Sequence, residues 1–152
     1  MGMDVVGRKN PDAYFRNSVW NWRPLAAYAC DIAPEITQHC RHWQSNDGDG
    51  LSEKNSKALA DVLEQEIKSG RCETYAKIRQ AEIDALPSEV CFLCEGTGRR
   101  KEPPLSGAGN VPCNGCNSTG SRRPNDVNYP FSVENVERFV KFLRKCGGFK
   151  IF

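Results

Sequence analysis

Four cysteines in the second half of the chain have the residue type and the spacing to hold a metal ion. They form two C-x-x-C pairs, Cys91 with Cys94 and Cys113 with Cys116, and eighteen residues separate the pairs. A C-x-x-C turn points both sulfurs at one centre, and two such turns supply four thiolates for a tetrahedral ion. We therefore predict one Zn²⁺. Because four thiolates leave no position open for water, we predict a structural and not a catalytic role.

The two pairs belong to an internal repeat with an offset of 22 residues. This offset superimposes Thr97 on Thr119 and Gly98 on Gly120. We expect two similar hairpins that face one metal ion with pseudo-twofold symmetry. A glycine after the second cysteine of each pair lets the backbone turn away and leaves amides free to bond the sulfurs.

The first repeat, C-x-x-C-x-G-x-G from Cys91 to Gly98, resembles the repeats in the cysteine-rich region of DnaJ-type co-chaperones. The second repeat has Ser118 in place of the first glycine. In that family four repeats make two zinc centres that assist client binding, so two repeats imply one centre. The chain contains no His-Pro-Asp triplet, through which the family's J-domain stimulates its ATPase partner. The resemblance therefore implies local structure and does not imply co-chaperone activity.

Several other segments resemble a group of small uncharacterised bacterial and phage-borne proteins with a zinc knuckle near the C-terminal third. They are residues 14–17, Trp20, residues 22–25, residues 46–51 and residues 129–131. This second resemblance implies a prokaryotic or viral source. It implies no activity.

The overall composition is that of a globular protein in a reducing compartment. The chain has 152 residues, 21 basic and 19 acidic, and a net charge of +2, which argues against a strongly electrostatic nucleic-acid binder. Its first residues show no basic start followed by an apolar stretch, so we expect no secretory signal. The longest weakly polar stretch, residues 24–30, is too short to cross a bilayer. We therefore expect a cytoplasmic protein (host cytoplasm if phage-encoded), in which paired cysteines bind metal and do not form disulfides.

Outside the cysteine pairs, the pattern of apolar residues predicts helices. We expect them over residues 12–22, 24–33, 34 to 42 or 43, 52–69, 71–85 and 132–146, with the two helices around Gly70 forming an antiparallel hairpin. Residues 149–152 alternate and would add a short strand or pack down. An aromatic core is expected from Tyr14, Trp20, Trp22, Tyr28 and Trp43.

The expected fold is thus mostly α, with a small β-hairpin zinc module inserted in a helical domain. Residues 1–87 would form the helical region with the aromatic core, and residues 88–125 the DnaJ-like zinc-binding module. Residues 126–152 would form a C-terminal helix that packs back on the helical region, because its apolar face is wide and needs cover.

Basic residues follow each C-x-x-C pair and are candidate contacts for a partner. They are Arg99, Arg100, Lys101, Arg122 and Arg123. If the two hairpins face each other, these five charges converge on one edge, where they would contact phosphates. The alternative is that they are the solvated flanks of the hairpins. No aromatic residue interleaves with them, as a single-strand binder would require.

The loop at residues 45–50 and the remaining cysteines offer weaker candidates. Asp47 and Asp49 resemble the first half of a calcium loop, but the twelfth position is Ser56, so we expect a tight acidic turn that leads to a helix N-terminus, with contact to a partner as the alternative. Cys40 lies beside His39, yet neighbouring residues on a helix point in different directions, which disfavours a nucleophile–base pair. Buried thiols are expected for Cys30, Cys72 and Cys146. The alternative is a second metal site formed by Cys30, Cys40, His42 and Cys72.

These observations favour a non-enzymatic, zinc-stabilised protein that binds another macromolecule. A protein partner is the first expectation, and an inhibitor of a host or defence system, encoded by a phage or prophage, is one form of it. Nucleic-acid binding through the arginines that flank the zinc knuckles is the alternative, and an enzyme with a Cys/His site comes third. No membrane or small-molecule substrate is expected.

Overall fold

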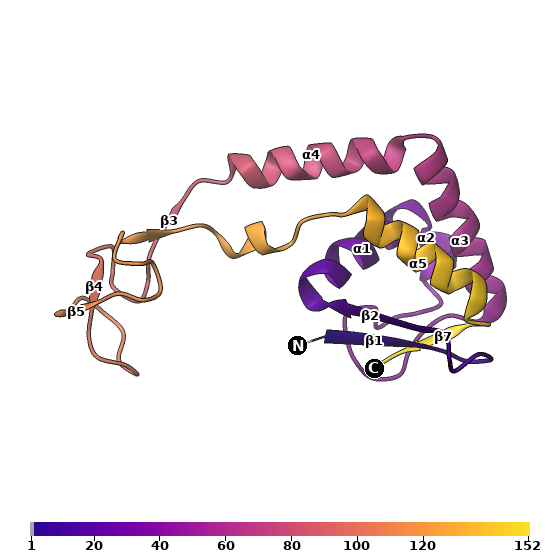
Figure 1. The fold of residues 1–152 in the computed structure, drawn as a ribbon, viewed down its shortest axis with the longest axis horizontal. Helices are drawn as coiled ribbons and strands as arrows, with labels where there is room; N and C mark the ends of the chain where they lie inside the picture. Colours follow the sequence, from indigo (N-terminus) through magenta and orange to yellow (C-terminus); the bar gives the residue numbers. More distant parts are fainter. Residues whose placement is uncertain (1) are drawn as a thin grey trace. The chain divides into compact units, whose positions relative to one another are not determined.

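The computed structural model describes residues 2–152, which divide into two compact units (Figure 1). We call residues 2–81 and 129–152 the body, and residues 82–128 the module. Helices make up 44% of the chain, the sheets are small, and four cysteines cluster in the module. The predicted combination of a helical domain with a small cysteine-bearing unit is confirmed at this level.

The body contains a three-stranded antiparallel sheet. Its strands are β1 (Gly2–Gly7), β2 (Tyr14–Ser18) and β7 (Phe149–Ile151), in the order β2-β1-β7. Val5 of the central strand lies opposite Phe15 on one side and Ile151 on the other, and all three are buried. Because side chains alternate along a strand, one face of the sheet packs into the core. Of the two alternatives for the C-terminal tail, a short strand or simple packing, the structure shows the strand.

The helix predicted over residues 12–22 is wrong in its first half, because residues 14–18 form β2. Phe15, Val19 and Trp22 fit a helical spacing, but the backbone of residues 14–18 pairs with β1. The helix begins only after Ser18, whose hydroxyl accepts the N–H of Asn21 at 3.3 Å. An N-cap residue keeps an extended backbone, so Ser18 can be both the last residue of β2 and the cap of the helix.

Two helices follow β2, and their bounds also differ from those predicted. α1 (Val19–Ile32) continues through Pro24, where we expected a new helix. α2 (Pro34–Thr37) begins at the predicted proline but ends early. The chain then folds back so that the Trp43 indole donates to the carbonyl of Thr37 at 3.1 Å, while Trp43 stacks on Trp22.

Two longer helices in the body pack against each other. α3 (Glu53–Lys68) and α5 (Val133–Lys145) begin at the predicted residues, with Ser52 and Ser132 as their caps. In each case the serine hydroxyl accepts a backbone N–H at 3.2 Å. Arg144 of α5 donates to carboxylates of α3, at 2.5 Å to Asp61 and 3.0 Å to Glu64.

The fourth helix, α4 (Arg71–Ala85), has the predicted bounds, but the predicted antiparallel hairpin with α3 is wrong. In Figure 1, α4 turns away from α3 instead of running back along it. Its apolar residues do not form a stripe, and Ile78 is 56% exposed. Near its start, Tyr75 packs on Tyr28 and Phe131, with ring centroids 4.7 Å apart in both pairs, and near its end Ile83 is buried.

The core of the body lies between the sheet, α1, α3 and α5. Its largest fully buried side chains are Trp22, Phe139, Phe149, Leu25, Leu51, Leu59, Leu63, Leu143 and Ile151. Trp22, Tyr28 and Trp43 are buried as predicted, whereas Tyr14 and Trp20 are exposed, so their assignment to the core is wrong. Tyr14 is exposed because it alternates with the buried Phe15 along a strand.

One edge of the sheet is covered by residues 48–51. The N–H of Gly48 donates to the carbonyl of Ile151 at 2.8 Å, the N–H of Ile151 to Asp49 at 2.8 Å, and the N–H of Phe149 to Leu51 at 2.9 Å. These bonds occupy the free side of β7. The strand at the other edge is β2.

The module contains four two-residue strands and a short 3₁₀ helix, Asn125–Asn128. The strands are β3 (Glu89–Val90), β4 (Arg99–Arg100), β5 (Val111–Pro112) and β6 (Ser121–Arg122). β3 pairs with β6 and β4 pairs with β5, both antiparallel. Each repeat therefore pairs its strands with those of the other repeat. The expectation of two separate hairpins that face each other is corrected to two interlocked repeats.

Candidate metal centre

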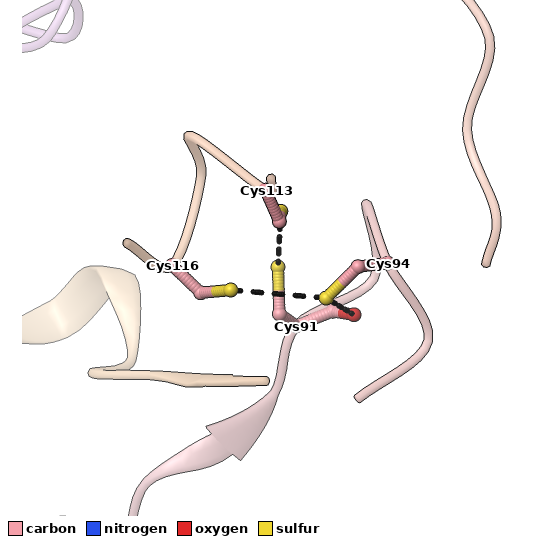
Figure 2. A group of neighbouring side chains, drawn as sticks. All are labelled: Cys91, Cys94, Cys113 and Cys116. Carbon is pink, nitrogen blue, oxygen red and sulfur yellow. Dashed lines mark hydrogen bonds between the residues drawn. The ribbon is translucent and has the colours of Figure 1, made fainter. Parts of the chain in front are cut away.

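The four cysteines of the two C-x-x-C pairs converge on one point (Figure 2). All four side chains are buried, and their sulfurs lie within 4.8 Å of one another. The Sγ atoms of Cys91 and Cys113 are 3.8 Å apart, and those of Cys94 and Cys116 are 3.7 Å apart. Such distances are far longer than a disulfide bond of about 2.05 Å. The group can hold a metal ion, and it is the one cluster of three or more candidate ligands in residues 2–152.

The backbone bonds around the sulfurs repeat with the 22-residue offset of the sequence. The N–H of Cys91 donates to the carbonyl of Gly120 at 2.9 Å, and the N–H of Cys113 donates to that of Gly98 at 3.0 Å. The threonine hydroxyls behave alike, with Thr97 donating to the Cys94 carbonyl at 2.7 Å and Thr119 to the Cys116 carbonyl at 2.6 Å. The module is thus a pseudo-twofold unit in which each repeat completes the hydrogen bonds of the other.

Two glycines let the repeats approach this closely. Gly98 and Gly120 both have positive φ, 75° and 80°. A Cβ atom at Gly98 would lie 2.4 Å from the carbonyl oxygen of Ser118, and one at Gly120 would lie 2.2 Å from that of Gly96. Any other residue would push the two repeats apart, because both the backbone angle and the space exclude a side chain.

The polar surroundings favour a thiolate at one of the four sulfurs. Burial by itself raises the pKa of the Cys116 thiol, but the N–H of Gly120, 3.3 Å from its sulfur, and the neighbouring thiols outweigh burial and lower this pKa to about 7. Burial raises the pKa of Cys113 to about 11. The thiolate is the form that coordinates a metal ion, and an amide that bonds the sulfur stabilises that form.

The five basic residues expected at one edge lie in different surroundings within the module. Arg100 is 7% exposed and donates to the side chain of Asn114 at 3.0 Å and the carbonyl of Leu105 at 3.0 Å. Arg99 donates to the carbonyl of Asn110, and Arg123 to that of Ile83 at 2.8 Å. β4 and β6 belong to separate two-stranded sheets, so Arg99 and Arg100 lie in one sheet and Arg122 in the other. Lys101 follows β4 and is exposed.

Asp47 and Asp49 organise their own loop in the body. One oxygen of Asp49 accepts the backbone N–H groups of Arg41 at 2.7 Å and His42 at 3.0 Å, and the other accepts the N–H of Gly50 at 2.8 Å. Asp47 pairs with the His42 ring at 2.6 Å. These bonds lower the pKa of Asp49 against the opposing effect of desolvation. The two carboxylates therefore hold the loop that covers β7.

The cysteines outside the pairs are unpaired thiols in the body. Cys40, Cys72 and Cys146 are buried, and Cys30 is half-buried. Burial raises the pKa of Cys40 to about 12 and that of Cys72 to about 11. At neutral pH these groups stay protonated, which makes them poor nucleophiles.

Sequence reasoning missed a group of exposed apolar residues in the module. Val90 is 70% exposed, Phe92 58% and Leu105 61%. The exposure of Phe92 could have been inferred from the sequence. Cys91 and Cys94 point inward and Leu93 packs against them, so Phe92 is the residue left on the outer side of the turn. The Phe92 ring carries the guanidinium of Arg122, 4.5 Å from its centroid.

Within residues 2–152, no helix combines the length and the apolar character that a bilayer crossing demands. Comparisons with models of protein families, with curated proteins and with solved structures find no match to this chain.

Proposed function

We propose that the ion held by the four cysteines is a structural Zn²⁺. A tetrahedral ion with Zn–S bonds of about 2.3 Å requires sulfurs about 3.8 Å apart. The Cys91–Cys113 and Cys94–Cys116 distances of 3.8 Å and 3.7 Å support this size. Four buried thiolates also fill every position of such an ion, which supports a role in folding over a role in catalysis.

We further propose that the chain is a non-enzymatic binding protein whose partner is another protein. The observation that carries this proposal is the exposure of Val90, Phe92 and Leu105 on a module whose own interior holds little besides cysteines. Large apolar side chains held at the surface of a rigid unit serve recognition better than stability. The high pKa of Cys40 supports the absence of a thiol nucleophile. A host or defence protein as the partner would make the chain an inhibitor.

A capture experiment tests the protein partner. The zinc-loaded chain is immobilised and exposed to lysate of the source cells, alongside a Val90→Ser/Phe92→Ser variant and an Ile78→Ser variant. Ile78 is a matched control because it is an exposed apolar residue outside the module's surface group, at 56% exposure. We expect one protein to be retained by the wild type and by Ile78→Ser and to be lost from the double variant. Equal retention by all three would contradict the proposal.

A further inference from the structure

The pseudo-twofold symmetry of the module is broken beside β4 and β6, which occupy equivalent positions in the two repeats. β4 pairs with β5 on one side, and residues 105–109, which we call the covering segment, lie along its other side. The N–H of Lys101 donates to the carbonyl of Gly107 at 3.0 Å. The N–H of Gly109 donates to the carbonyl of Arg99 at 3.1 Å. Both sides of β4 are therefore occupied by the module itself.

The equivalent side of β6 has no covering segment. The 22-residue offset places Ser121 at the position of Arg99, and it places Arg123 at that of Lys101. Within residues 2–152, the backbone N–H of Arg123 makes no hydrogen bond, and the carbonyl of Ser121 accepts only the hydroxyl of Thr119, at 2.8 Å. Strand edges with free backbone groups are where an extended segment can add as a further strand.

The arginines of the two strands show the same difference. Arg100 of β4 is 7% exposed, and all three of its guanidinium nitrogens donate hydrogen bonds, one of them to the carbonyl of Leu105 in the covering segment at 3.0 Å. Arg122 of β6 is half-buried, and in the described part of the chain none of its guanidinium nitrogens makes a hydrogen bond, although its Nε is shielded from solvent. Arg122 therefore lacks the hydrogen bonds that Arg100 makes, and a buried donor costs free energy until it has a partner.

The surface beside Arg122 is apolar, whereas that beside Arg100 is polar. Arg100 donates to the side chain of Asn114 at 3.0 Å. The residue that corresponds to Asn114 in the other repeat is Phe92, whose ring centroid lies 4.5 Å from the Cζ of Arg122. Val90 lies on β3, the strand that pairs with β6. A segment bound at β6 would therefore contact the exposed apolar side chains to which we assign protein binding.

The charges and the available space define the ligand. Glu89 lies opposite Arg122 in the β3–β6 register, although no ion pair joins them within residues 2–152. Because this carboxylate already balances the charge of the arginine, a neutral main-chain carbonyl suits the site better than an acidic side chain. The covering segment also lies very close to its strand, since a Cβ at Gly109 would be 2.3 Å from the backbone nitrogen of Lys101. A segment bound in the same way needs a glycine at that point.

We propose that β6, Arg122 and Phe92 bind an extended, glycine-containing segment of the partner protein, in the way that β4 and Arg100 bind the covering segment. The inference rests on the proposed protein binding by the module and identifies the part of the partner that is bound. One carbonyl of the segment accepts from Arg122 and a second from the N–H of Arg123, while an N–H of the segment donates to the carbonyl of Ser121. An apolar side chain of the segment covers the ring of Phe92. These contacts add a third strand to the β3–β6 pair.

A peptide with the sequence of residues 103–110 tests the proposal, because it contains the covering segment. It is titrated to millimolar concentration into the full, zinc-loaded, ¹⁵N-labelled chain. We expect saturable shifts of the Arg123 amide and of the Arg122 Nε–H, with the amides of β4 unchanged because that strand is already covered. The same peptide with Gly109→Val should not bind, since the new side chain would meet the strand. Absence of saturable shifts, shifts centred on β4, or equal binding of the valine peptide would each overturn the proposal.

Variants of the chain identify the individual contacts. Arg122→Gln should weaken peptide binding about tenfold or more, because it removes a charge-assisted hydrogen bond. Lys101→Gln, a control of equal charge beside the covered strand, should stay within about twofold of the wild type. Arg123→Pro should weaken binding about threefold or more through loss of its N–H, whereas Arg123→Ala, which keeps the N–H, should stay within about twofold. Zinc content and circular dichroism confirm that every variant is folded.

The capture experiment, extended to these variants, separates this proposal from the proposed function. Loss of the same protein from Val90→Ser/Phe92→Ser and from Arg122→Gln would support both. Loss from the double variant alone, with full retention by Arg122→Gln and Arg123→Pro, would leave protein binding intact and overturn the binding of a segment at β6. Retention by every variant would contradict the proposed function, and the peptide titration would then decide by itself whether β6 binds an extended segment.

Discussion

The body and the module hold their structures by different means. The body buries aromatic and aliphatic side chains from the sheet and helices in one continuous core, with Trp22, Phe139 and Phe149 at its centre. The module buries four cysteines, with Leu93 beside them, and leaves its largest apolar side chains in solvent. A candidate metal site thus takes the place that a hydrophobic core occupies in the body.

This difference follows from how much apolar surface each unit can remove from water. Units below about 40 residues usually bury too little to offset the entropy of ordering their chain, and the module, residues 82–128, is close to this size. Metals or disulfides then supply the missing stability. The sulfurs of Cys91, Cys94, Cys113 and Cys116 lie where such a crosslink joins both repeats. The body needs no crosslink, and its four cysteines remain free thiols.

Removal of the metal should produce the largest effect and should affect the module alone. A structural zinc contributes on the order of 10 kcal/mol of folding free energy in small units, so chelation or Cys94→Ser should unfold the module. Two-dimensional ¹⁵N–¹H spectra should show residues 88–124 collapsing to unfolded positions, while body residues such as Trp22 and Phe139 keep theirs. Elemental analysis should give one zinc per chain.

Cys30→Ser is the matched control, because it also removes one thiol but lies in the body. It should leave the spectrum of the module and the zinc content unchanged. A module that stays structured without metal, or a body that unfolds together with it, would remove the distinction between the two units.

The second prediction concerns the reactivity of the eight thiols. With zinc bound, alkylation at pH 8 should be slow at all of them. After chelation the four module thiols should react quickly, whereas Cys40, with a pKa of about 12 against an ordinary 9.0, should react about a thousandfold more slowly than an exposed thiol. Its rate should rise tenfold per pH unit up to about pH 12. Mass spectrometry of alkylated peptides measures each site.

These raised pKa values also imply a direction for stability. A thiol whose pKa is higher in the folded state stabilises that state fully at any pH below its unfolded pKa, which is near 9. This stabilisation is lost as the pH rises through the folded pKa. The body should therefore lose stability between about pH 9 and pH 12, with burial of Cys40 and Cys72 as the cause. A urea midpoint that stays constant over this range would contradict it.

The module could be predicted from the sequence because its chemistry is local. The C-x-x-C spacing predicts which sulfur atoms come together. The 22-residue repeat predicts the pseudo-twofold symmetry that is seen in the hydrogen bonds of Cys91 and Cys113. What the repeat could not reveal is how the strands pair, because β3 can pair with β4 or with β6 and both satisfy the same local pattern. The interlocked arrangement depends on the close contact at Gly98 and Gly120.

The first two strands of the body's sheet were missed, because one pairing is distant in sequence and the other uses a segment that also fits a helical spacing. β1 joins β2 and also the last strand, β7, with Val5 opposite Ile151. Residues 14–22 satisfy a helical spacing, so periodicity alone favours a helix until β1 offers its partners. Helices with local signals were predicted correctly, as the capping serines Ser52 and Ser132 show.

A core substitution in the body provides the third and smaller effect. Phe139 is fully buried and packs against Phe15, Trp22 and Phe149 at centroid distances of 5.1, 5.7 and 6.1 Å. Phe139→Ala should lower the free energy of unfolding of the body by about 3–5 kcal/mol without loss of zinc. Phe92→Ala, which removes an exposed ring from the module, should cost within about 0.5 kcal/mol. Urea titration followed by tryptophan fluorescence measures the effect of Phe139→Ala on the body. Competition with a chelator for zinc measures the effect of Phe92→Ala on the module. Similar costs for both would mean that the module also depends on apolar packing.

The smallest effect concerns one of the positions at which the two repeats of the module differ, Gly96 in the first and Ser118 in the second. Ser118 has φ 63° where its counterpart Gly96 has φ 83°, a region that costs a residue with a Cβ about 1 kcal/mol. Ser118→Gly removes this cost but adds freedom to the unfolded chain, so we expect a net gain of about 0.5 kcal/mol, seen as roughly twofold tighter zinc binding against a chelator. Gly96→Ser should weaken binding, because the new Cβ would also lie 3.2 Å from Val90. If Ser118→Gly weakened zinc binding and Gly96→Ser strengthened it, Ser118 would have a role in its repeat beyond occupying the position of a glycine.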